Sequence, residues 1–343
     1  MNTWALLNTL TTRCRTLPIV ILYVTEGCNL QCISCSYRTP PPGELALEEI
    51  APLARALIHG GLRHIVYSGG EPLTRRDFPD ICPLFARGGV RQTLLTNGLL
   101  LEKRFAEISP FLDEFIVSLD GADAATHDAI RGVESYERIV RGIRRLVEAG
   151  RGDDVAVRTV VQKRNFRSLP AMVDAARALG VGRISFLAAD VRSSGFGRGE
   201  RGPSAPAETM TLDGDETLAL RGIVDRLERE RAPLFARRFI DQSPARLRDI
   251  ASYFEALRGA CAFPPVRCNA PMVSTVITSR GDVLPCYFLP PFGNVRRGAI
   301  DELLNGDAPR TTRRSVRART QPECRTCVCT LRVGPAQALA DRF

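Results

Sequence analysis

The feature that most constrains this fold is a regular alternation of short apolar runs with amphipathic segments over the first 190 residues. Six runs predict β-strands: Pro18–Val24, His64–Ser68, Gln92–Thr96, Glu114–Leu119, Val155–Val161 and Arg183–Leu187. The segments between them predict helices: Leu47–His59, Asp77–Arg87, Phe105–Ile108, Tyr136–Ala149 and Leu169–Leu179. Strands that alternate with helices pair in parallel, so we expect an α/β protein built as a partial (β/α)6 barrel of the TIM type.

The character of the chain changes after Asp190. Segments 193–199 and 202–206 are rich in Gly, Ser and Pro, which indicates loops. Two further helices are predicted over Asp213–Arg231 and Pro244–Leu257, before a cysteine-bearing region that begins at Cys261. We therefore expect an N-terminal extension over 1–16, the barrel over 17–200, a linker over 201–260 and a second domain over 261–343. A chain of 343 residues exceeds the roughly 250–300 residues that one core usually supports.

The eleven cysteines need an explanation other than packing. Nothing near the N-terminus matches a cleavable signal, and no apolar stretch approaches the roughly 20 residues of a membrane span, so we expect a cytoplasmic protein. In a reducing compartment such cysteines are metal or cluster ligands rather than disulfides. The net charge of +9 comes from arginines interleaved with acids, without the basic tail or aromatic stripe of a nucleic-acid binder.

Three cysteines stand in one loop after the first predicted strand, in the order Cys28, Cys32 and Cys35. Thiolates hold iron–sulfur clusters, and four of them complete a four-iron cube. Three leave one iron open to a ligand, as in catalytic rather than structural metal sites. Zinc is the alternative, but no fourth cysteine or histidine lies near this loop in the sequence. The pattern favours a cluster with an open iron.

Together with this loop, the end of the second predicted strand, Ser68-Gly69-Gly70-Glu71-Pro72, resembles the radical S-adenosylmethionine (SAM) superfamily. The resemblance implies a [4Fe–4S] cluster on the three cysteines with SAM on its open iron. It also implies that Gly69, Gly70 and Glu71 hold the amino group of SAM. A flavodoxin or ferredoxin-type protein is the expected electron donor.

The resemblance extends to later strand ends, where we expect further contacts to SAM from Asn97, Ser118, Asp120, Arg158 and Leu187. Ser118 and Asp120 are assigned to the ribose hydroxyls, although Asp120 before Gly121 equally suits a turn. Arg158 interrupts an apolar strand and so needs an anionic partner, for which the carboxylate of SAM is the candidate. The family usually places an aromatic residue before the third cysteine, and Ser34 stands there instead. Tyr37 is therefore expected to cover the adenine.

A second cysteine set is spread over the C-terminal region. Cys268 precedes and Cys286 lies within a predicted hairpin of segments 273–278 and 283–288, and Cys324 and Cys327 form a later CxxC pair. This arrangement, with a helix expected over Ile300–Asn305, resembles the SPASM or twitch extension of the radical SAM family. It implies one auxiliary [4Fe–4S] cluster on these four cysteines, with a zinc site as the alternative.

Two cysteines are left over near this second set, Cys261 and Cys329. Either replaces one of the four proposed ligands, or donates a hydrogen atom to a substrate radical, or is a spare thiol. These three interpretations stay open at the level of the sequence.

We expect SAM to be cleaved to a 5′-deoxyadenosyl radical that abstracts hydrogen from a small polar natural-product intermediate of the sugar, aminocyclitol or nucleoside type. Oxidation, epimerisation or rearrangement follows, with Arg192 and Arg198 as possible contacts to an anionic substrate. The residues before Leu17 are too few for a peptide leader-binding domain, and peptide maturation is the alternative. An iron–sulfur electron carrier or redox sensor is the non-enzymatic alternative, and it has no need for Gly69-Gly70-Glu71.

Overall fold

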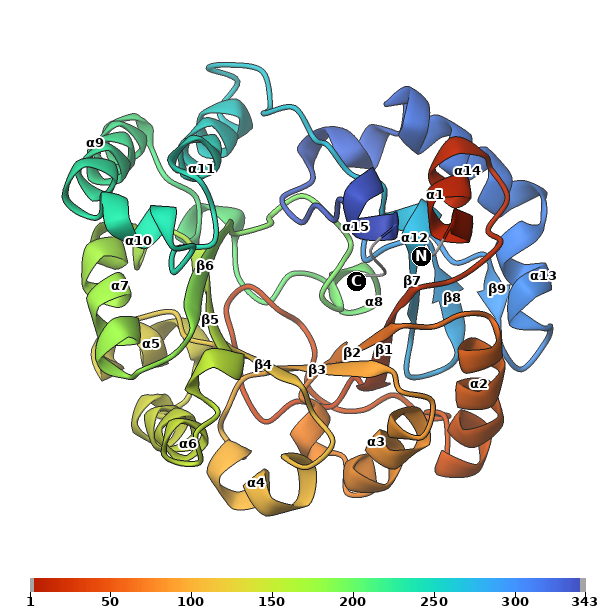
Figure 1. Cartoon of the computed structure of the whole chain (residues 1–343). Helices are drawn as coiled ribbons and strands as arrows, with labels where there is room; N and C mark the ends of the chain where they lie inside the picture. Colours follow the sequence, from red (N-terminus) through yellow and green to blue (C-terminus); the bar gives the residue numbers. More distant parts are fainter. Residues whose placement is uncertain (1–2, 340–343) are drawn as a thin grey trace.

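A computed structural model describes residues 3–339, and its strands form one nine-stranded sheet in the order β6-β5-β4-β3-β2-β1-β7-β8-β9. All six predicted strands are present: β1 (Ile19–Thr25), β2 (His64–Gly69), β3 (Arg91–Thr96), β4 (Glu114–Ser118), β5 (Val155–Val161) and β6 (Arg183–Ala188). Each neighbouring pair among them is parallel. Figure 1 shows that these strands curve into the wall of a partial barrel, as the sequence predicts.

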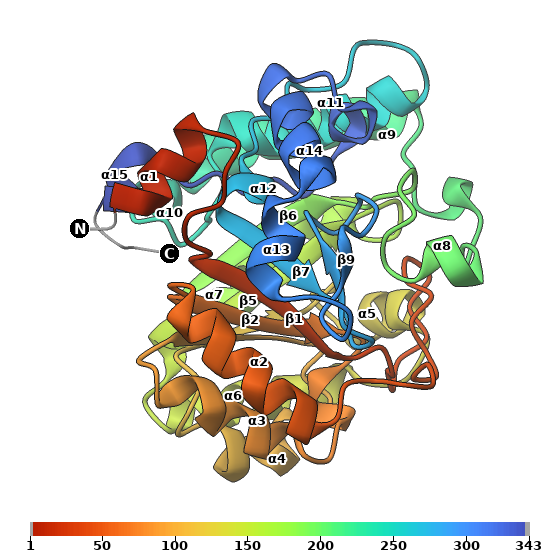
Figure 2. The ribbon, with the colours of Figure 1, turned by 90° about the vertical axis from the view of Figure 1, so that its right-hand side faces the viewer.

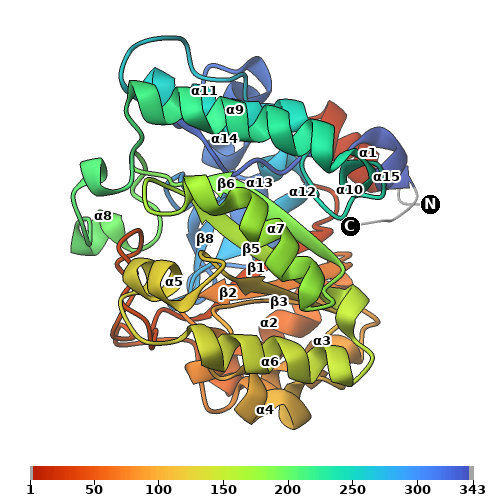
Figure 3. The same ribbon diagram turned by 90° about the vertical axis from the view of Figure 1, so that its left-hand side faces the viewer.

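The predicted helices cover the outer face of this wall (Figures 1 and 3). They are α2 (Leu47–His59), α3 (Phe78–Ala86), α4 (Leu101–Ile108), α6 (Tyr136–Glu148) and α7 (Leu169–Ala178). The main apolar core lies between them and the outward-facing side chains of the strands, with Leu22, Ile65 and Phe115 almost fully buried. A further helix, α5 (Ala124–Arg131), was not expected from the sequence, and it lies beside the cysteine loop.

The C-terminal region continues the sheet of the barrel. Strand β7 (Ser274–Ile277) pairs in parallel with β1, and β8 (Asp282–Leu284) and β9 (Gly293–Asn294) add on in antiparallel order. The predicted hairpin is therefore present, although it is shorter than expected. Because β7 is hydrogen-bonded to the first barrel strand, the C-terminal strands lie beside β1 of the barrel (Figure 2).

The remaining helices cover the open edge of the barrel and the C-terminal strands. Helices α9 (Gly214–Glu230) and α11 (Pro244–Leu257), both predicted, pack together above β6 (Figure 3). The others are α1 (Thr3–Leu10), α8 (Arg198–Arg201), α10 (Ala232–Ala236), α12 (Ala270–Val273), the predicted α13 (Ile300–Asn305), α14 (Asp307–Ala318) and α15 (Pro335–Leu339). Every helix within residues 3–339 is too short or too polar to span a membrane.

Candidate active site

The loop that carries the first three cysteines is fixed by backbone hydrogen bonds to the end of α5. The N–H of Gln31 donates to the carbonyl of Arg131 (3.0 Å), and the N–H of Ile33 donates to that of Ile130 (3.1 Å). Loops that hold clusters need such support, because three thiols must keep their relative positions. Helix α5, which was not predicted, therefore holds the cysteine loop that was predicted.

The thiols of this loop lie in a dry environment. Burial is the main cause that raises the pKa of Cys28 to about 12 and that of Cys35 to about 11, and the neighbouring Cys32 contributes to both shifts. In a four-iron cluster each thiolate binds its own iron, and the three thiols of this loop can supply three such ligands.

The two glycines of the second strand end allow β2 to press against the base of the cysteine loop. A Cβ atom at Gly70 would stand 2.1 Å from the carbonyl oxygen of Gly27, and one at Gly69 would stand 2.2 Å from that of Thr25. Gly69 also has φ +110°, which side chains disfavour. The N–H of Gly70 donates to Thr25 O at 2.8 Å. These contacts give a packing reason for the glycines, in addition to the predicted contact with SAM.

The side chain of Glu71 connects the ends of two strands. It is completely buried, and its carboxylate accepts hydrogen bonds from the N–H of Leu73 (3.0 Å), the hydroxyl of Thr96 (2.8 Å) and the N–H of Asn97 (2.6 Å). Burial raises its pKa to about 7. The carboxylate thus joins the ends of β2 and β3, and its contact with the amino group of SAM stays a prediction.

Asn97 connects the end of β3 to the cysteine loop. Its Nδ2 donates to Asn29 Oδ1 at 2.8 Å and approaches Cys28 Sγ at 3.8 Å. Hydrogen bonds to cluster sulfurs are one of the factors that set the reduction potential of a cluster. Asn97 therefore acts on the cluster site, whereas the sequence suggested only a contact with SAM.

Asp120 is paired with an arginine that the sequence did not single out. Its carboxylate forms an ion pair with Arg131 (2.7 Å) and accepts the N–H of Val160 (2.8 Å), and it is 2% exposed. Its contact with the ribose hydroxyls stays a prediction. Arg131 extends the chain of contacts, since its Nη1 lies 3.7 Å from Cys32 Sγ. The contact bridges 99 positions, and no local pattern reveals it.

His127 supports the same corner and makes the protein sensitive to acid. It is fully buried, its Nδ1 accepts the N–H of Asp120 (3.1 Å), and burial lowers its pKa from 6.5 to about 3. The folded chain therefore binds fewer protons than the unfolded chain between these values, so stability falls as the pH drops below 6.5. We expect His127→Asn to remove about 1.4 kcal/mol per pH unit of this slope in urea unfolding of the metal-free protein. An unchanged slope contradicts the assignment.

The other predicted SAM contacts divide into two groups. Ser118 lies on the same face of β4 as Ile116, which lines the interior cavity, so its proposed contact with ribose is retained. Tyr37 is instead packed inside the protein, with the ring of Tyr23 6.2 Å away and Arg201 Cζ 5.7 Å from its own ring. This packing gives Tyr37 a place in the apolar core, and its contact with adenine stays a prediction.

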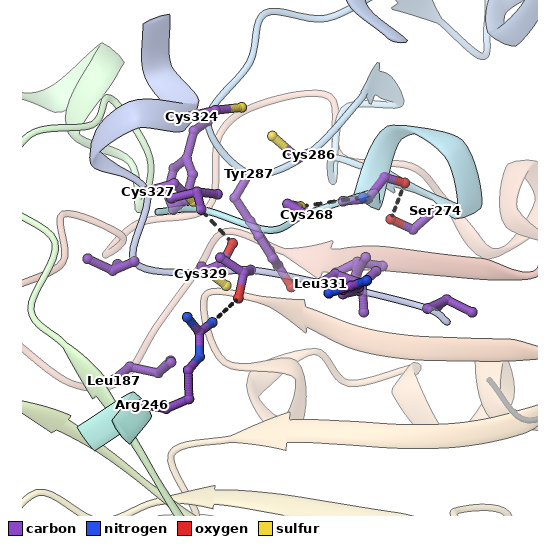
Figure 4. A pocket seen from close by; sticks show the side chains of 18 of the residues that line it. Leu187, Arg246, Cys268, Ser274, Cys286, Tyr287, Cys324, Cys327, Cys329 and Leu331 are labelled. Carbon is purple, nitrogen blue, oxygen red and sulfur yellow. Dashed lines mark hydrogen bonds between the residues drawn. The ribbon is translucent and has the colours of Figure 1, made fainter. Parts of the chain in front are cut away.

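A cavity of about 650 Å³ lies between the barrel interior and the C-terminal region. Leu187 lines it from the barrel side, and Tyr287 and Cys329 line it from the other side (Figure 4). Arg158 of β5 also lines it. The Nε of Arg158 donates to the hydroxyl of Ser185 at 3.3 Å, and none of the carboxylates within residues 3–339 forms an ion pair with it. The predicted need of Arg158 for an anion is therefore unmet by the protein itself.

The second cysteine set lines the same cavity. Figure 4 shows Cys268, Cys286, Cys324 and Cys327 around its upper wall, with Cys329 below them. Burial raises the pKa of Cys286 to about 12 and that of Cys324 to about 11, and the other thiols of the set contribute to both shifts. The tertiary structure thus brings together four cysteines that the sequence spreads over 60 positions.

Three other residues proposed from the sequence lie away from this cavity. Cys261 is exposed, and its Sγ lies 3.6 Å from Ser252 O on α11 rather than in the lining of the cavity. Arg198 is held by Asp190 and by the carbonyl of Ser34 (3.1 Å). Arg192 is exposed to solvent and does not line the cavity.

Comparisons with known families agree with this geometry. Residues 22–176 match the radical SAM superfamily model, and residues 268–328 match the SPASM iron–sulfur cluster-binding domain. An AdoMet-dependent heme synthase of Methanosarcina barkeri is 36% identical over 163 residues, 46% of each chain. A GTP 3′,8-cyclase of Rhodopirellula baltica is 31% identical over 236 residues, 59% of this chain and 65% of the relative. The chain spans about half the length of the curated relatives it matches.

Solved structures show the same fold. The anSMEcpe enzyme with bound AdoMet and a Cp18Cys peptide superposes with a TM-score of 0.64 at 17% identity, covering 91% of this chain and 86% of the other. SuiB of Streptococcus suis, bound to its precursor peptide SuiA, gives 0.62 at 16% identity, covering 92% and 71%. The two domain matches imply [4Fe–4S] clusters in both regions, with SAM bound at the first. The chain carries a radical SAM domain over residues 22–176 and a C-terminal SPASM iron–sulfur cluster-binding domain over residues 268–328.

Proposed function

We propose that this radical SAM enzyme acts on a small natural-product intermediate that carries a carboxylate or phosphate, bound in the cavity between the two cluster sites. The observation that carries the proposal is Arg158, a cation on the cavity wall without a carboxylate partner among residues 3–339. When bound, the first cluster and SAM supply a 5′-deoxyadenosyl radical that removes a hydrogen atom from the substrate. A flavodoxin or ferredoxin-type protein supplies the electron.

The side chains of the first site fit the cluster. Three thiols share the loop, and two hydrogen-bond donors point at their sulfurs, from Asn97 to Cys28 and from Arg131 to Cys32. The Nε of Arg131 is buried without a hydrogen-bond partner among the described residues. Buried donors of this kind require negative charge nearby, which a thiolate-ligated cluster provides.

Arg158 selects the substrate class in this proposal. A guanidinium inside a cavity is stabilised by a carboxylate or phosphate, which it binds through two parallel hydrogen bonds. Its Nε is directed to Ser185, which orients the side chain within the barrel interior. The GTP cyclases among the relatives act on a nucleoside that carries phosphates, and this supports an anionic substrate for the related barrel here.

Cys329 is the proposed hydrogen donor. It lines the cavity, and its pKa is raised by burial, although Arg158 opposes this shift. A thiol that stays protonated keeps the S–H bond that hydrogen-atom donation to a substrate radical requires. Donation from one face after abstraction from the other inverts the carbon centre and leaves a thiyl radical on Cys329, which one electron from the auxiliary cluster and one proton would return to the thiol. Electron loss from the substrate radical to the auxiliary cluster would instead oxidise the substrate. Cys329 thus favours epimerisation as the outcome.

Iron content separates a ligand from a donor. We expect Cys327→Ala to lose about four irons per chain, because one corner of the auxiliary cluster loses its ligand. We expect Cys329→Ala to keep the wild-type iron content, because its role is toward the substrate. Cys261→Ala is the matched control on an exposed thiol and changes nothing. Loss of iron from Cys329→Ala contradicts its assignment as the donor.

The proposed function is tested by anaerobic reconstitution, reduction with dithionite and addition of SAM. Absence of 5′-deoxyadenosine contradicts the hypothesis that the protein is a radical SAM enzyme and favours the alternative of an iron–sulfur electron carrier. Anion-exchange fractions of a cell extract are then added, and we expect the acidic small-molecule fraction to stimulate 5′-deoxyadenosine formation. We expect the Arg158→Met variant to lose this stimulation. The control variant Arg192→Met is expected to keep it, because Arg192 is exposed and does not line the cavity. Stimulation by the neutral fraction, or by a peptide fraction alone, contradicts the proposed substrate class.

A further inference from the structure

Three tyrosine rings form a row between the two cysteine sites. Tyr287 directly follows Cys286 of the second set, and Tyr37 stands two positions after Cys35 of the first. Tyr23, on β1, lies between them: its ring is stacked on that of Tyr287 at 6.2 Å and 22°, and it meets that of Tyr37 edge-on at 6.2 Å and 78°. Figure 4 shows Tyr287 extending from the auxiliary cysteines toward the barrel strands. The aromatic row thus begins at one cysteine set and ends at the other.

The row belongs to one packed apolar cluster that reaches both sites. This cluster includes Tyr23 and Tyr37, each buried, and cysteines of both sets pack against it, namely Cys28, Cys35, Cys286 and Cys324. Protein interiors of this kind are close-packed, with few voids between neighbouring side chains. The two sites are therefore connected through side chains in van der Waals contact.

The tyrosines have no other role in the site described above. Tyr23 and Tyr37 are buried, and Tyr287 packs against the same apolar cluster. Backbone hydrogen bonds and strand pairing also hold the two cysteine regions in place. Packed aromatic rings conduct an electron between redox centres better than a gap or a water-filled channel does.

We propose that the row Tyr287–Tyr23–Tyr37 is the electron-transfer bridge between the auxiliary cluster and the first cluster. One electron passes from the reduced auxiliary cluster to the oxidised first cluster. The auxiliary cluster is thereby oxidised by one electron, and the first cluster is reduced by one electron. The rings are the medium and are neither oxidised nor deprotonated, so no proton moves. The inference rests on the presence of both clusters in the proposed function, and it adds a route by which the two clusters exchange an electron.

A second aromatic path starts from the same tyrosine. The ring of Phe288 lies 6.2 Å from that of Tyr287 and 6.0 Å from that of Phe196, whose carbonyl oxygen is 3.6 Å from Cys35 Sγ. This path leaves the apolar cluster, because Phe196 lies in the loop after Asp190. The tyrosine row is therefore the favoured path, and Phe196 supplies a matched control.

The test follows electron redistribution directly. The full chain is loaded with both clusters, given less than one reducing equivalent and mixed rapidly, and the two cluster signals are followed by freeze-quench EPR. We expect Tyr23→Leu to slow the transfer several-fold, because it breaks both ring contacts. Tyr23→Phe keeps the ring and retains the wild-type rate, and so does Phe196→Leu. Tyr287→Leu breaks the row at its other end and serves as the second variant if Tyr23→Leu fails to load iron.

The outcomes separate this inference from the proposed function. A wild-type transfer rate in a fully loaded Tyr23→Leu or Tyr287→Leu protein overturns the bridge. A Tyr23→Phe rate as slow as that of Tyr23→Leu also overturns it, because the hydroxyl and not the ring then matters. Slowing by Phe196→Leu alone assigns the path to the phenylalanines. Formation of 5′-deoxyadenosine with excess dithionite does not depend on the bridge, so its absence refutes the proposed function instead.

Discussion

Replacing Cys28, Cys32 and Cys35 together by alanine is expected to abolish 5′-deoxyadenosine formation and to remove about four irons per chain. The three thiols share one loop whose backbone is held by α5, and no other cysteine belongs to this loop. With the ligands gone, no open iron remains to bind SAM. Iron and sulfide analysis after anaerobic reconstitution, together with chromatography of the nucleoside product, measures both effects.

The matched control for this variant is Cys82→Ala. Cys82 is a fully buried thiol in α3, and its Sγ contacts the carbonyl of Phe78 (3.4 Å) and the hydroxyl of Tyr67. We expect this variant to keep its iron and its activity. A triple variant that retains the full iron content, or a control that loses it, contradicts the assignment of the first cluster to the loop.

Breaking the Asp120–Arg131 ion pair is the second large effect. We expect Arg131→Met to lower the free energy of unfolding by about 3–5 kcal/mol, because it leaves the buried carboxylate of Asp120 without its partner. The double variant Asp120→Asn with Arg131→Met recovers part of this loss, since no charge is then left buried alone. Urea unfolding of the metal-free protein measures all three proteins.

The control for this pair lies on the surface. Arg141 and Glu102 form an ion pair at 3.2 Å, and each side chain is 51% exposed. We expect Arg141→Met to change stability by about 0–1 kcal/mol, because solvent screens exposed pairs. Equal effects of the buried and the exposed substitutions contradict the structural role given to Arg131.

We expect Arg131→Met to affect the first cluster as well as stability. Arg131 directs Nη1 to Cys32 Sγ, and a positive donor near a cluster sulfur favours the reduced state, which carries one more negative charge. We therefore expect Arg131→Met to lower the reduction potential of the first cluster and to leave that of the auxiliary cluster unchanged, as EPR-monitored redox titration measures. A change confined to the auxiliary cluster contradicts the contact.

The local patterns of the chain predicted most of the architecture. The six strands of the barrel begin and end within one residue of their predicted limits, because a buried parallel strand is a short apolar run bounded by polar turns. Helix α5 was missed because its sequence AATHDAIR has only a short apolar stripe. Its Asp123 cap and the following Gly132 were the signals available.

Some features of the candidate site follow from local sequence, and others depend on tertiary contacts. By itself the sequence determined the barrel, the cysteine loop and the CxxC pair, since each depends on residues close together in the chain. Only the tertiary structure decided which way Glu71 and Asp120 turn, that Arg131 reaches Cys32, and that Arg158 faces a cavity shared with the second cysteine set. The physical reason is that these contacts join separate strand ends and loops. Their partners are set by sheet register and by the close approach at Gly69 and Gly70, which no spacing within one segment encodes.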